Sequence, residues 1–562
     1  MTQRLNIFIL AVLIGIEHVY SVEYLFNNGK SDYVISLTPN CMVEEQIAAQ
    51  ELQYYIEKIS DIRLVIVKEI SQRGKCIKLS AENTDEEGFV YSCDSSQITI
   101  HGYGKRGVLY GVYEFLEKEF GIHWFTSKHT VIPRKSSYKL GPFRKDKRPA
   151  FESRLNYYYE ALHDESWCLH NRVNTTQPIK NHINQTSWWG MHTMKELIPE
   201  SRYFAVHPEY FCLRNGKRQR GGQLCLSNPD VVALAIKGIK EIIRTNPFYR
   251  IYDVSQNDNR LFCQCKKCAG IAERYGGLSG LNIWFVNQVA RSVYLSFPDK
   301  LIGTFAYRET RSAPSGIKPE KNVAIRVCAF ETCIIHGLSE CRTNVYFKTE
   351  LEKWKGITTN LYVWDYCVGF KQYLAPCPDF RAMASRMQAY SRYGVKGVLM
   401  EGNYEGVWGE FSELRQWLAA KLMWDPHQDV DSLARVFIYS YYGASAPKIM
   451  EYYLLAQQTA TQSVHYTIYA DHKNPVYSNA FIQSGRKLVD DALRLAGNDK
   501  ALKKKVQRIA AQIYYLVFAR SYSDSVRDGT FTMLTRILES DPTYLMEYHK
   551  DFAETLKTLN VR

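Results

Sequence analysis

The chain has 562 residues, of which 46% are hydrophobic and 23% are charged, as in folded globular proteins and unlike disordered ones. This length predicts two or three domains. The formal net charge is +13, but the basic residues are scattered and form no continuous face, so no nucleic-acid partner is expected. The 40 Tyr, 25 Phe and 10 Trp residues supply flat apolar faces that suit both a core and the C–H surfaces of sugars.

Residues 1–21 have the pattern of a secretion signal. Arg4 is followed by an apolar run over residues 7–16, and Val19 and Ser21 provide small residues before a cut between Ser21 and Val22. This run is too short to cross a bilayer, and no later stretch approaches 18 apolar residues. The protein is therefore expected to be exported, to the periplasm or the extracellular space, without membrane insertion.

Residues 22–145 predict a small α/β domain. Apolar residues at helical spacing predict a helix over residues 43–60, and short alternating segments at 64–67, 76–79 and 97–101 predict strands. A glycine-rich turn at 102–107 leads into a second expected helix at 108–120. One such turn, without a βαβ unit and a following acidic residue, is weak grounds for a phosphate site. No cofactor is expected.

Residues 150–425 predict a (β/α)₈ TIM-type barrel, because about eight strand–loop–helix alternations follow one another. A doubly wound open sheet would give a similar alternation. The expected strands are 153–159, 167–173, 223–226, 250–254, 301–307, 323–329, 361–366 and 395–400. Residues 426–562 lack strand-like alternation and predict a C-terminal helical region.

The cysteines include one closely spaced group among the 14 in the chain. Cys263, Cys265 and Cys268 form a C-x-C-x-x-C knuckle, which could present three thiolates to a structural zinc ion with Cys212 or Cys225 as the fourth ligand. A local disulfide with one spare thiol is the alternative in an exported protein. A catalytic metal is not expected in either case.

The active site of a barrel enzyme lies where strands end, and polar or aromatic residues occur at several of the expected strand ends. They include Asn257 and Asp258, Tyr307, Glu331, the run Trp364, Asp365 and Tyr366, and Glu401.

Glycoside hydrolysis needs a carboxylic acid that protonates the departing oxygen and a second group opposite it. If the substrate carries a 2-acetamido group, its carbonyl can be the nucleophile. Asp258 is then the expected acid with Glu331 as its rival, and Asn257 would bind the acetamido group. Tyr307, Trp364 and Tyr366 would wall the sugar, Asp365 would bind hydroxyls, and Glu401 would be the base if an enzyme-held water attacked instead.

Several longer motifs carry a resemblance to a known family. Five runs resemble the catalytic region of glycoside hydrolase family 163. They are 255–259 with the cysteine knuckle, 189–193, 207–211, 224–229 and 362–366. The N-terminal part resembles the non-catalytic α/β domain that precedes barrels in hexosaminidases and α-glucuronidases. Trp189 and His192, which lie in one of these runs, join the expected substrate-binding residues.

The resemblance implies an endo-β-N-acetylglucosaminidase that cuts the chitobiose core of N-glycans, with a glycan or glycoprotein as substrate. An exo-acting β-hexosaminidase or an α-glucuronidase would share the two-domain plan. A carbohydrate-binding barrel without catalysis would keep the aromatic residues but could dispense with Asp258 and Glu331.

Overall fold

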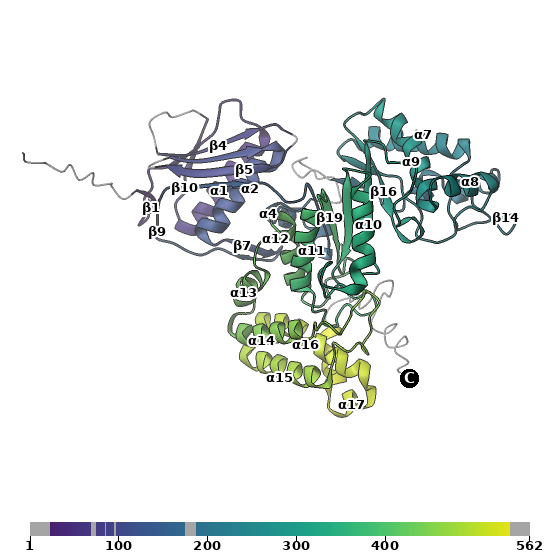
Figure 1. Ribbon diagram of the computed structural model, residues 1–562. Coiled ribbons are helices and arrows are strands. Elements are labelled where there is room, and N and C mark those ends of the chain that lie inside the picture. Colours follow the sequence, from purple (N-terminus) through teal and green to yellow (C-terminus); the bar gives the residue numbers. More distant parts are fainter. Residues whose placement is uncertain (1–22, 69–74, 85, 95–96, 175–186, 540–562) are drawn as a thin grey trace, which may run out of the picture.

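The computed structural model describes residues 23–68, 75–84, 86–94, 97–174 and 187–539, and the predicted secretion signal lies outside them. An N-terminal α/β unit stands beside a parallel barrel, and a bundle of helices follows the barrel (Figure 1). No helix within the described ranges is long and apolar enough to cross a membrane.

The N-terminal unit is a six-stranded sheet with two helices packed on one face (Figure 1). Its order is β10 (Phe143–Lys147), β5 (Gly88–Asp94), β6 (Gln97–Tyr103), β4 (Cys76–Glu82), β2 (Val34–Ser36) and β3 (Val65–Val67). The helices are α1 (Val43–Ser60), with the bounds that its periodicity predicts, and α2 (Gly104–Phe120). Two small sheets pair β1 (Tyr24–Asn27) with β9 (Ser137–Lys139) and β7 (His123–Thr126) with β8 (His129–Val131).

The glycine-rich turn between β6 and α2 has a structural explanation. A Cβ atom on Gly102 would overlap the backbone of Gly107 and Val108, so only glycine permits the start of α2 to lie this close to the strand. The turn therefore serves helix–strand packing.

The central unit is a curled sheet of seven parallel strands. Its order is β11 (Ser153–Tyr157), β19 (Gly397–Glu401), β18 (Leu361–Tyr366), β17 (Val323–Cys328), β16 (Leu301–Ala306), β15 (Ile251–Asp253) and β12 (Trp188–Trp189). A parallel bridge between Leu155 and Asn174 adds an eighth strand position on the free side of β11. The predicted TIM-type barrel is confirmed, with β15 at the fourth position along the chain and β19 at the eighth.

Two of the eight expected strands are wrong. Residues 167–173 lie largely in helix α4 (Glu165–His170), which begins where the Asp164 side chain accepts the backbone N–H of Trp167. Residues 223–226 form an irregular loop with a single antiparallel bridge between Phe211 and Leu224, and β12 takes the third barrel position. Both segments contain several buried apolar residues, and a short run of this kind does not distinguish strand from helix or loop.

Helices follow the barrel strands and cover them. They are the short α3 (Tyr159–His163), α5 (Met194–Leu197) and α6 (Glu200–Tyr203), then α7 (Pro229–Thr245), α8 (Lys266–Arg274), α9 (Leu278–Tyr294), α10 (Val345–Lys355), α11 (Phe380–Arg392) and α12 (Ser412–Trp424). The start of α7 shows how sequence sets such a boundary, because Asn228 caps it and Pro229 occupies its first turn, where no N–H is needed. A hairpin of β13 (Leu213–Arg214) and β14 (Lys217–Arg218) projects before α7.

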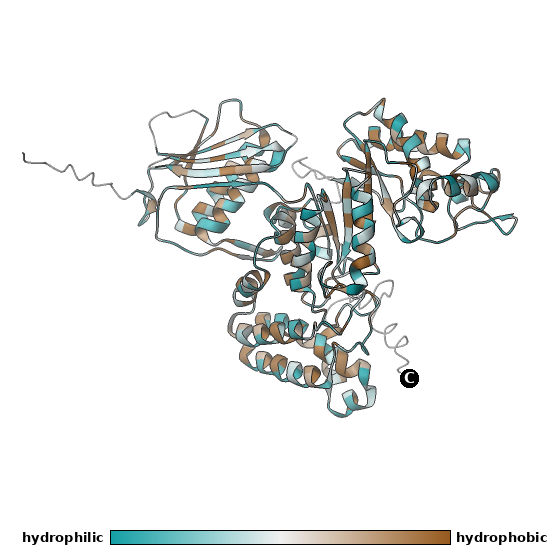
Figure 2. Cartoon of the chain, in the orientation of Figure 1, coloured by the Kyte–Doolittle hydropathy of each residue, from teal (hydrophilic) through white to brown (hydrophobic). Residues whose placement is uncertain are grey.

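The C-terminal region is helical, as predicted. It contains α13 (Val430–Tyr441), α14 (Ala446–Gln458), α15 (Asn479–Ala496), α16 (Lys500–Arg520), α17 (Tyr522–Arg527) and α18 (Thr530–Leu538). These helices carry both hydrophobic and hydrophilic residues (Figure 2), which is typical of helices that bury one face. The connection between α14 and α15 returns to the barrel, where Ile334 and Phe370 donate their backbone N–H groups to the carbonyls of Tyr466 and Ile468.

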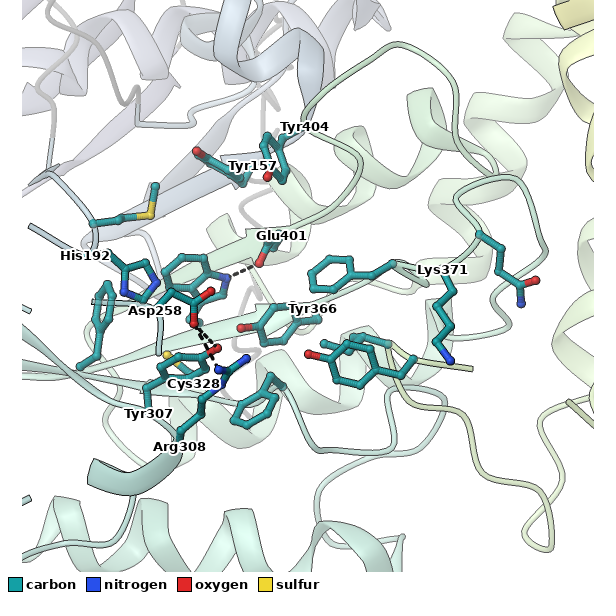
Figure 3. Close-up of a pocket in the computed structure, with 18 of the residues that line it drawn as sticks. Tyr157, His192, Asp258, Tyr307, Arg308, Cys328, Tyr366, Lys371, Glu401 and Tyr404 are labelled. Carbon is teal, nitrogen blue, oxygen red and sulfur yellow. Dashed lines mark hydrogen bonds and ion pairs between the residues drawn. The ribbon is translucent and has the colours of Figure 1, made fainter. Parts of the chain in front are cut away.

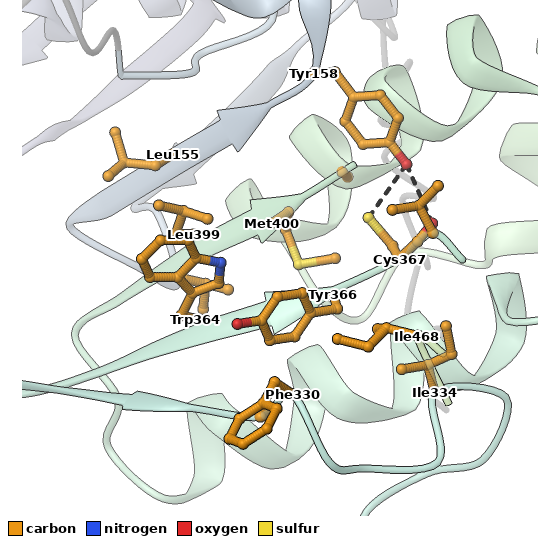
Figure 4. Packing of buried hydrophobic residues seen from close by; sticks show 14 of the residues in the cluster. Leu155, Tyr158, Phe330, Ile334, Trp364, Tyr366, Cys367, Leu399, Met400 and Ile468 are labelled. Atoms are coloured by element: carbon orange, nitrogen blue, oxygen red, sulfur yellow. Dashed lines mark hydrogen bonds between the residues drawn. The ribbon is translucent and has the colours of Figure 1, made fainter. Parts of the chain in front are cut away.

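The barrel core is continuous with that returning connection. Side chains of β11, β18 and β19, among them Leu155, Trp364 and Leu399, pack in one cluster that includes Ile468 (Figure 4). The segment that joins two C-terminal helices is therefore part of the barrel's hydrophobic core.

A buried ion network joins the N-terminal unit to the barrel. The Glu117 carboxylate of α2 accepts a hydrogen bond from the Lys421 ammonium group of α12 at 2.6 Å. The guanidinium group of Arg172 lies 3.4 Å from the same carboxylate. Arg172 also pairs with Glu114 at 2.6 Å. Beside these charges, the Trp424 ring of α12 stacks on Phe89 with ring centroids 5.8 Å apart.

Candidate active site

A cavity of about 780 Å³ opens at the carboxyl ends of the barrel strands. Residues from β11, β16, β17, β18 and β19, from the loop after β15 and from the connection between α14 and α15 line it (Figure 3). In barrel enzymes this end of the strands carries the catalytic groups. The residues that line it include Tyr157, His192, Asp258, Phe305, Tyr307, Arg308, Phe330, Trp364, Tyr366, Phe370, Glu401, Tyr404, Ile468, Tyr469, Asp471, His472 and Tyr515.

Asp258 lies at the mouth of the cavity, where 44% of its side chain is exposed. The Tyr307 hydroxyl donates to its Oδ1 at 3.0 Å, and the Arg308 guanidinium lies 3.5 Å from the same oxygen. Burial, with Asp258 beside it, raises the pKa of Tyr307 far above its ordinary value, so the phenol remains a donor. Arg308 has a left-handed backbone with φ of 51°, an uncommon conformation for a non-glycine residue.

Glu401 is the last residue of β19, and only 5% of it is exposed. The indole N–H of Trp364, on the neighbouring strand, donates to its Oε2 at 2.7 Å. Because β15 and β19 are the fourth and eighth strands, Asp258 and Glu401 come from opposite sides of the barrel and face the same cavity.

Aromatic rings form most of the remaining wall. Trp364 and Tyr366 are two residues apart on β18, and their rings lie nearly parallel with centroids 6.3 Å apart. The other rings are Tyr157, Phe305, Tyr307, Phe330, Phe370, Tyr404, Tyr469 and Tyr515. A cavity with apolar faces and a few fixed polar groups suits a carbohydrate, whose rings carry both C–H faces and hydroxyl edges.

His192 is held as a neutral side chain. Its Nδ1 lies 2.7 Å from the carbonyl oxygen of Gln256 and donates to it, which leaves Nε2 unprotonated. Burial lowers the pKa of His192 below its ordinary value, in agreement with this protonation state.

The loop that carries Asp258 rests on a buried carboxyl group. Asp253 ends β15, and its side chain accepts from Trp188, Thr193 and Ser255. Burial raises the pKa of Asp253 to about 7. This residue has no exposed surface, so it positions the loop and does not contact substrate.

The structure brings six of the predicted site residues to the cavity, namely Asp258, Tyr307, Trp364, Tyr366, Glu401 and His192. It does not bring Asn257 there. The Asn257 side chain accepts the backbone N–H of Lys195 at 3.0 Å and donates to the carbonyl of Gly222 at 2.9 Å, so it braces the loop.

Three further predicted residues also lie outside the cavity lining. Glu331 is half exposed and pairs with Arg311 at 3.0 Å. Asp365 is fully buried and pairs with Arg386 at 2.9 Å, so the expectation that it binds sugar hydroxyls is wrong for this structure. Trp189 packs partly buried against the barrel core.

Sequence reasoning missed several of the residues that line the cavity. Arg308 follows Tyr307 at a strand end and could have been included by the same argument. Asp471 and His472 had no such indication, because they lie in a connection between two helices more than 60 residues after the last barrel strand.

Within the part of the chain that the structure describes, two groups of side chains outside the cavity lining could hold a metal ion. The first group is the knuckle of Cys263, Cys265 and Cys268 together with Cys225. Of the two expected candidates for the fourth ligand, Cys225 is therefore part of the group and Cys212 is not. The second group consists of Cys333, His336, Cys341 and His465.

Comparison with solved structures supports the barrel architecture. A family 89 glycoside hydrolase from Clostridium perfringens, in complex with GlcNAc-α-1,4-galactose, superposes with a TM-score of 0.51 at 10% identity, over 88% of this chain and 64% of that one. This chain thus spans somewhat less than two thirds of that structure.

Weaker similarities are to a family 138 enzyme that targets pectin rhamnogalacturonan II and to a family 20 β-N-acetylhexosaminidase from Streptomyces coelicolor A3(2). The first has a TM-score of 0.47 at 9% identity, over 94% of this chain and 78% of that one. The second has a TM-score of 0.40 at 12% identity, over 77% and 95%. At these identities the likeness concerns the fold.

Among curated protein sequences there is no significant match. One family model covers residues 124–454, which is more than half of the chain and includes every barrel strand. The chain therefore belongs to the family described as "Domain of unknown function (DUF4838)".

Proposed function

We propose that this protein is an exported glycoside hydrolase, and specifically an endo-β-N-acetylglucosaminidase that cleaves the chitobiose core of N-glycans. One observation carries the proposal: two carboxylates, Asp258 and Glu401, face an aromatic-walled cavity from opposite sides at the active end of a TIM-type barrel. Hydrolysis of a glycosidic bond needs such a pair of groups. The solved glycoside hydrolases with the same architecture and the motif resemblance to family 163 add to this support.

The two carboxylates have different surroundings, which suggests different roles. Asp258 lies at the mouth, where the leaving portion of a glycan and water have access, so we assign the proton transfer to it. Tyr307 and Arg308 stabilise the carboxylate that remains after the proton has left. Glu401 is buried and fixed by Trp364, as suits a group that orients one substituent of the bound sugar.

In the proposed reaction the acetamido carbonyl oxygen of the substrate attacks C1 while the bond between C1 and the glycosidic oxygen breaks. Asp258 gives its proton to that oxygen. Glu401 accepts a hydrogen bond from the acetamido N–H and so increases the electron density on the attacking oxygen. Water then opens the resulting oxazolinium ring at C1 and returns a proton to Asp258, which restores the enzyme and retains the β configuration.

This assignment moves the acetamido-binding role from Asn257 to Glu401. The oxygen and the nitrogen of the Asn257 amide are hydrogen-bonded to Lys195 and Gly222, whereas the Glu401 carboxylate faces the cavity. If water rather than the acetamido group attacked C1, the first product would be the α anomer, and Glu401 would be the base. Following the product anomers by NMR decides between the two reactions.

The test of the activity uses a set of N-glycoproteins and mass spectrometry of what is released. An endo-enzyme leaves one N-acetylglucosamine on the asparagine and releases a glycan that ends in the other. An exo-enzyme releases single sugars from the outer ends, and a binding protein releases nothing. Either of these two results contradicts the proposal.

The site is tested with Asp258→Asn and Glu401→Gln, each expected to lower turnover by about 10²-fold or more, as removal of a general acid or its partner does. The matched control is Glu331→Gln, which neutralises the rival carboxylate outside the cavity and should leave turnover near the wild-type value. The site is misplaced if Asp258→Asn and Glu401→Gln both retain near-normal turnover.

Export rests on residues 1–21 and is tested separately. The secreted protein should begin at Val22, which N-terminal sequencing or intact-mass measurement would show. Retention in the cytosol with the first 21 residues intact would refute it.

A further inference from the structure

A second group of metal-ligand side chains lies where the barrel meets the C-terminal region. Cys333, His336 and Cys341 belong to the loop after β17, and His465 belongs to the connection between α14 and α15. Their four ligand atoms all lie within 4.8 Å of one another. Cys333 Sγ is 3.3 Å from His336 Nδ1, and Cys341 Sγ is 3.4 Å from His465 Nδ1.

These distances fit tetrahedral zinc. With Zn–S bonds of about 2.3 Å and Zn–N bonds of about 2.0 Å, a sulfur and a nitrogen on one ion are about 3.5 Å apart. Three of the four side chains are buried, and two thiolates with two imidazoles form a donor set that zinc prefers.

The surroundings prepare His336 as a ligand. Its Nε2 lies 3.1 Å from the carbonyl oxygen of Thr461, so that nitrogen carries the proton and Nδ1 keeps its lone pair toward Cys333. A backbone carbonyl that fixes the second ring nitrogen in this way is usual for zinc-bound histidine. Cys333 Sγ also accepts the backbone N–H of Tyr466 at 3.4 Å, and the Asn344 side chain holds the Cys333 backbone at 2.7 Å.

We propose that Cys333, His336, Cys341 and His465 bind a structural zinc ion. Four protein ligands leave no open position for a substrate or water, so the ion stabilises structure and takes no part in catalysis. It fastens the connection between α14 and α15 to the barrel, and Ile468, Tyr469, Asp471 and His472 of this connection line the cavity. The metal thus supports one wall of the active site, whatever reaction that site performs.

The cysteine knuckle supports a second zinc ion on independent grounds. Cys225 Sγ lies 3.7 Å from Cys265 Sγ and 3.9 Å from Cys268 Sγ. Two thiolates on one tetrahedral zinc are about 3.8 Å apart, whereas a disulfide holds its sulfurs about 2.05 Å apart. Backbone N–H groups of Leu213 and Cys268 point at the sulfurs of Cys263 and Cys265, at 3.3 and 3.4 Å, and stabilise thiolates there.

This second site supports the loop that carries Asp258. Cys225 follows a loop whose Gln223 side chain accepts the backbone N–H of Asn257 at 2.9 Å and donates to the Asn257 carbonyl at 2.8 Å. Asn257 precedes Asp258, so an ion that holds Cys225 to the knuckle also fixes the backbone beside the proposed acid.

The experiment is elemental analysis of the full-length protein, purified without added metal or chelator, with a count of reactive thiols after unfolding. We expect two zinc ions per chain. His465→Ala and Cys268→Ser should each retain one, and the control variants His427→Ala and Cys41→Ser, which lie outside both groups, should retain two. Zinc at neither site, another metal, or a disulfide between Cys333 and Cys341 would overturn the proposal.

A cobalt exchange on the wild-type protein gives a result even if the variants fail to fold. Cobalt(II) in either site should give the intense visible absorption of tetrahedral coordination together with sulfur-to-metal charge transfer. Weak, octahedral-type absorption would contradict both sites. His465→Ala should also raise the KM for glycan more than it lowers kcat, because it loosens a wall of the cavity and removes no reacting group.

Discussion

At the scale of single residues, the Glu401 carboxylate accepts a hydrogen bond from the indole N–H of Trp364 at 2.7 Å. Trp364→Phe keeps an aromatic ring in the wall and removes that donor. A hydrogen bond to a charged group contributes about 1.5–3 kcal/mol, so kcat/KM should fall by about 10-fold or more.

The matched control for this change is Trp354→Phe, which removes another buried indole donor, to the carbonyl of Arg311, outside the cavity. This variant should lose stability but keep the kcat/KM of its folded fraction. If the Trp364→Phe variant were as active as the wild type on glycoprotein, the hydrogen bond from Trp364 to Glu401 would have no part in the reaction.

Asp253 predicts how stability depends on pH. Its pKa of about 7 in the folded protein exceeds the ordinary value of 3.8, so the folded state binds a proton that the unfolded state has released. The contribution of Asp253 to the free energy of unfolding is fully present below pH 3.8. It is lost as the pH rises to about 7, at up to about 1.4 kcal/mol per pH unit.

Urea unfolding of wild type and Asp253→Asn at pH 5 and pH 7 measures this contribution. The asparagine cannot ionise, so the wild type should lose more free energy of unfolding than the variant over that interval. A parallel change in both proteins would mean that Asp253 is ionised in the folded state throughout.

Strand geometry explains which site residues could be predicted from sequence. Position at a strand end correctly brings Asp258, Tyr307 and Glu401 to the cavity. It does not give the direction of each side chain. On β18, Trp364 and Tyr366 face the cavity, and Asp365 between them faces Arg386, because alternate residues of a strand point to opposite sides. Applying that alternation to the sequence would have excluded Asp365.

At the scale of elements, Gly402 directly follows β19 and packs against the residue that directly follows β11. A Cβ atom at this position would overlap the ring of Tyr158, which is buried and whose hydroxyl is hydrogen-bonded to the Cys367 thiol. Gly402→Ala should therefore lower the free energy of unfolding by about 1–3 kcal/mol, as overpacking of a core does. It should also lower kcat, because Glu401 is the preceding residue.

Gly270→Ala is the matched control, since an added Cβ on this exposed residue of α8 has open space around it. Alanine in a helix is more favourable than glycine by up to about 1 kcal/mol, so this variant should be as stable as wild type or more so. Thermal unfolding of both variants, together with glycan release, makes the comparison.

The elements that sequence predicts well are those with a sustained period. Helix α1 repeats its apolar residues over five turns, and strands such as β16 and β18 are mostly apolar segments in a regular alternation with helices. The wrong strand at 223–226 lies in a buried loop, and its Cys225 belongs to the cysteine group. The returning connection between α14 and α15 has no period at all, so its place in the cavity wall depends on contacts that only the folded chain makes.

At the scale of the whole molecule, the N-terminal unit and the barrel share charges as well as apolar surface. Lys421, Arg172 and Glu117 are all nearly inaccessible to water, and Glu117 is the anion between the two cations. Desolvation of these groups is costly, and their mutual attraction offsets the cost only while the set is complete.

Glu117→Gln should therefore destabilise the protein by about 3–5 kcal/mol, because it leaves two buried cations without their shared partner. The control is Glu57→Gln, which breaks an exposed pair with Arg63 and should cost less than about 1 kcal/mol. Differential scanning calorimetry measures both and also reports cooperativity. If the network holds the two units together, the Glu117 variant should show two separate transitions where the wild type shows one. A single transition with an unchanged midpoint would show that the apolar contact of Trp424 with Phe89 suffices to join the units.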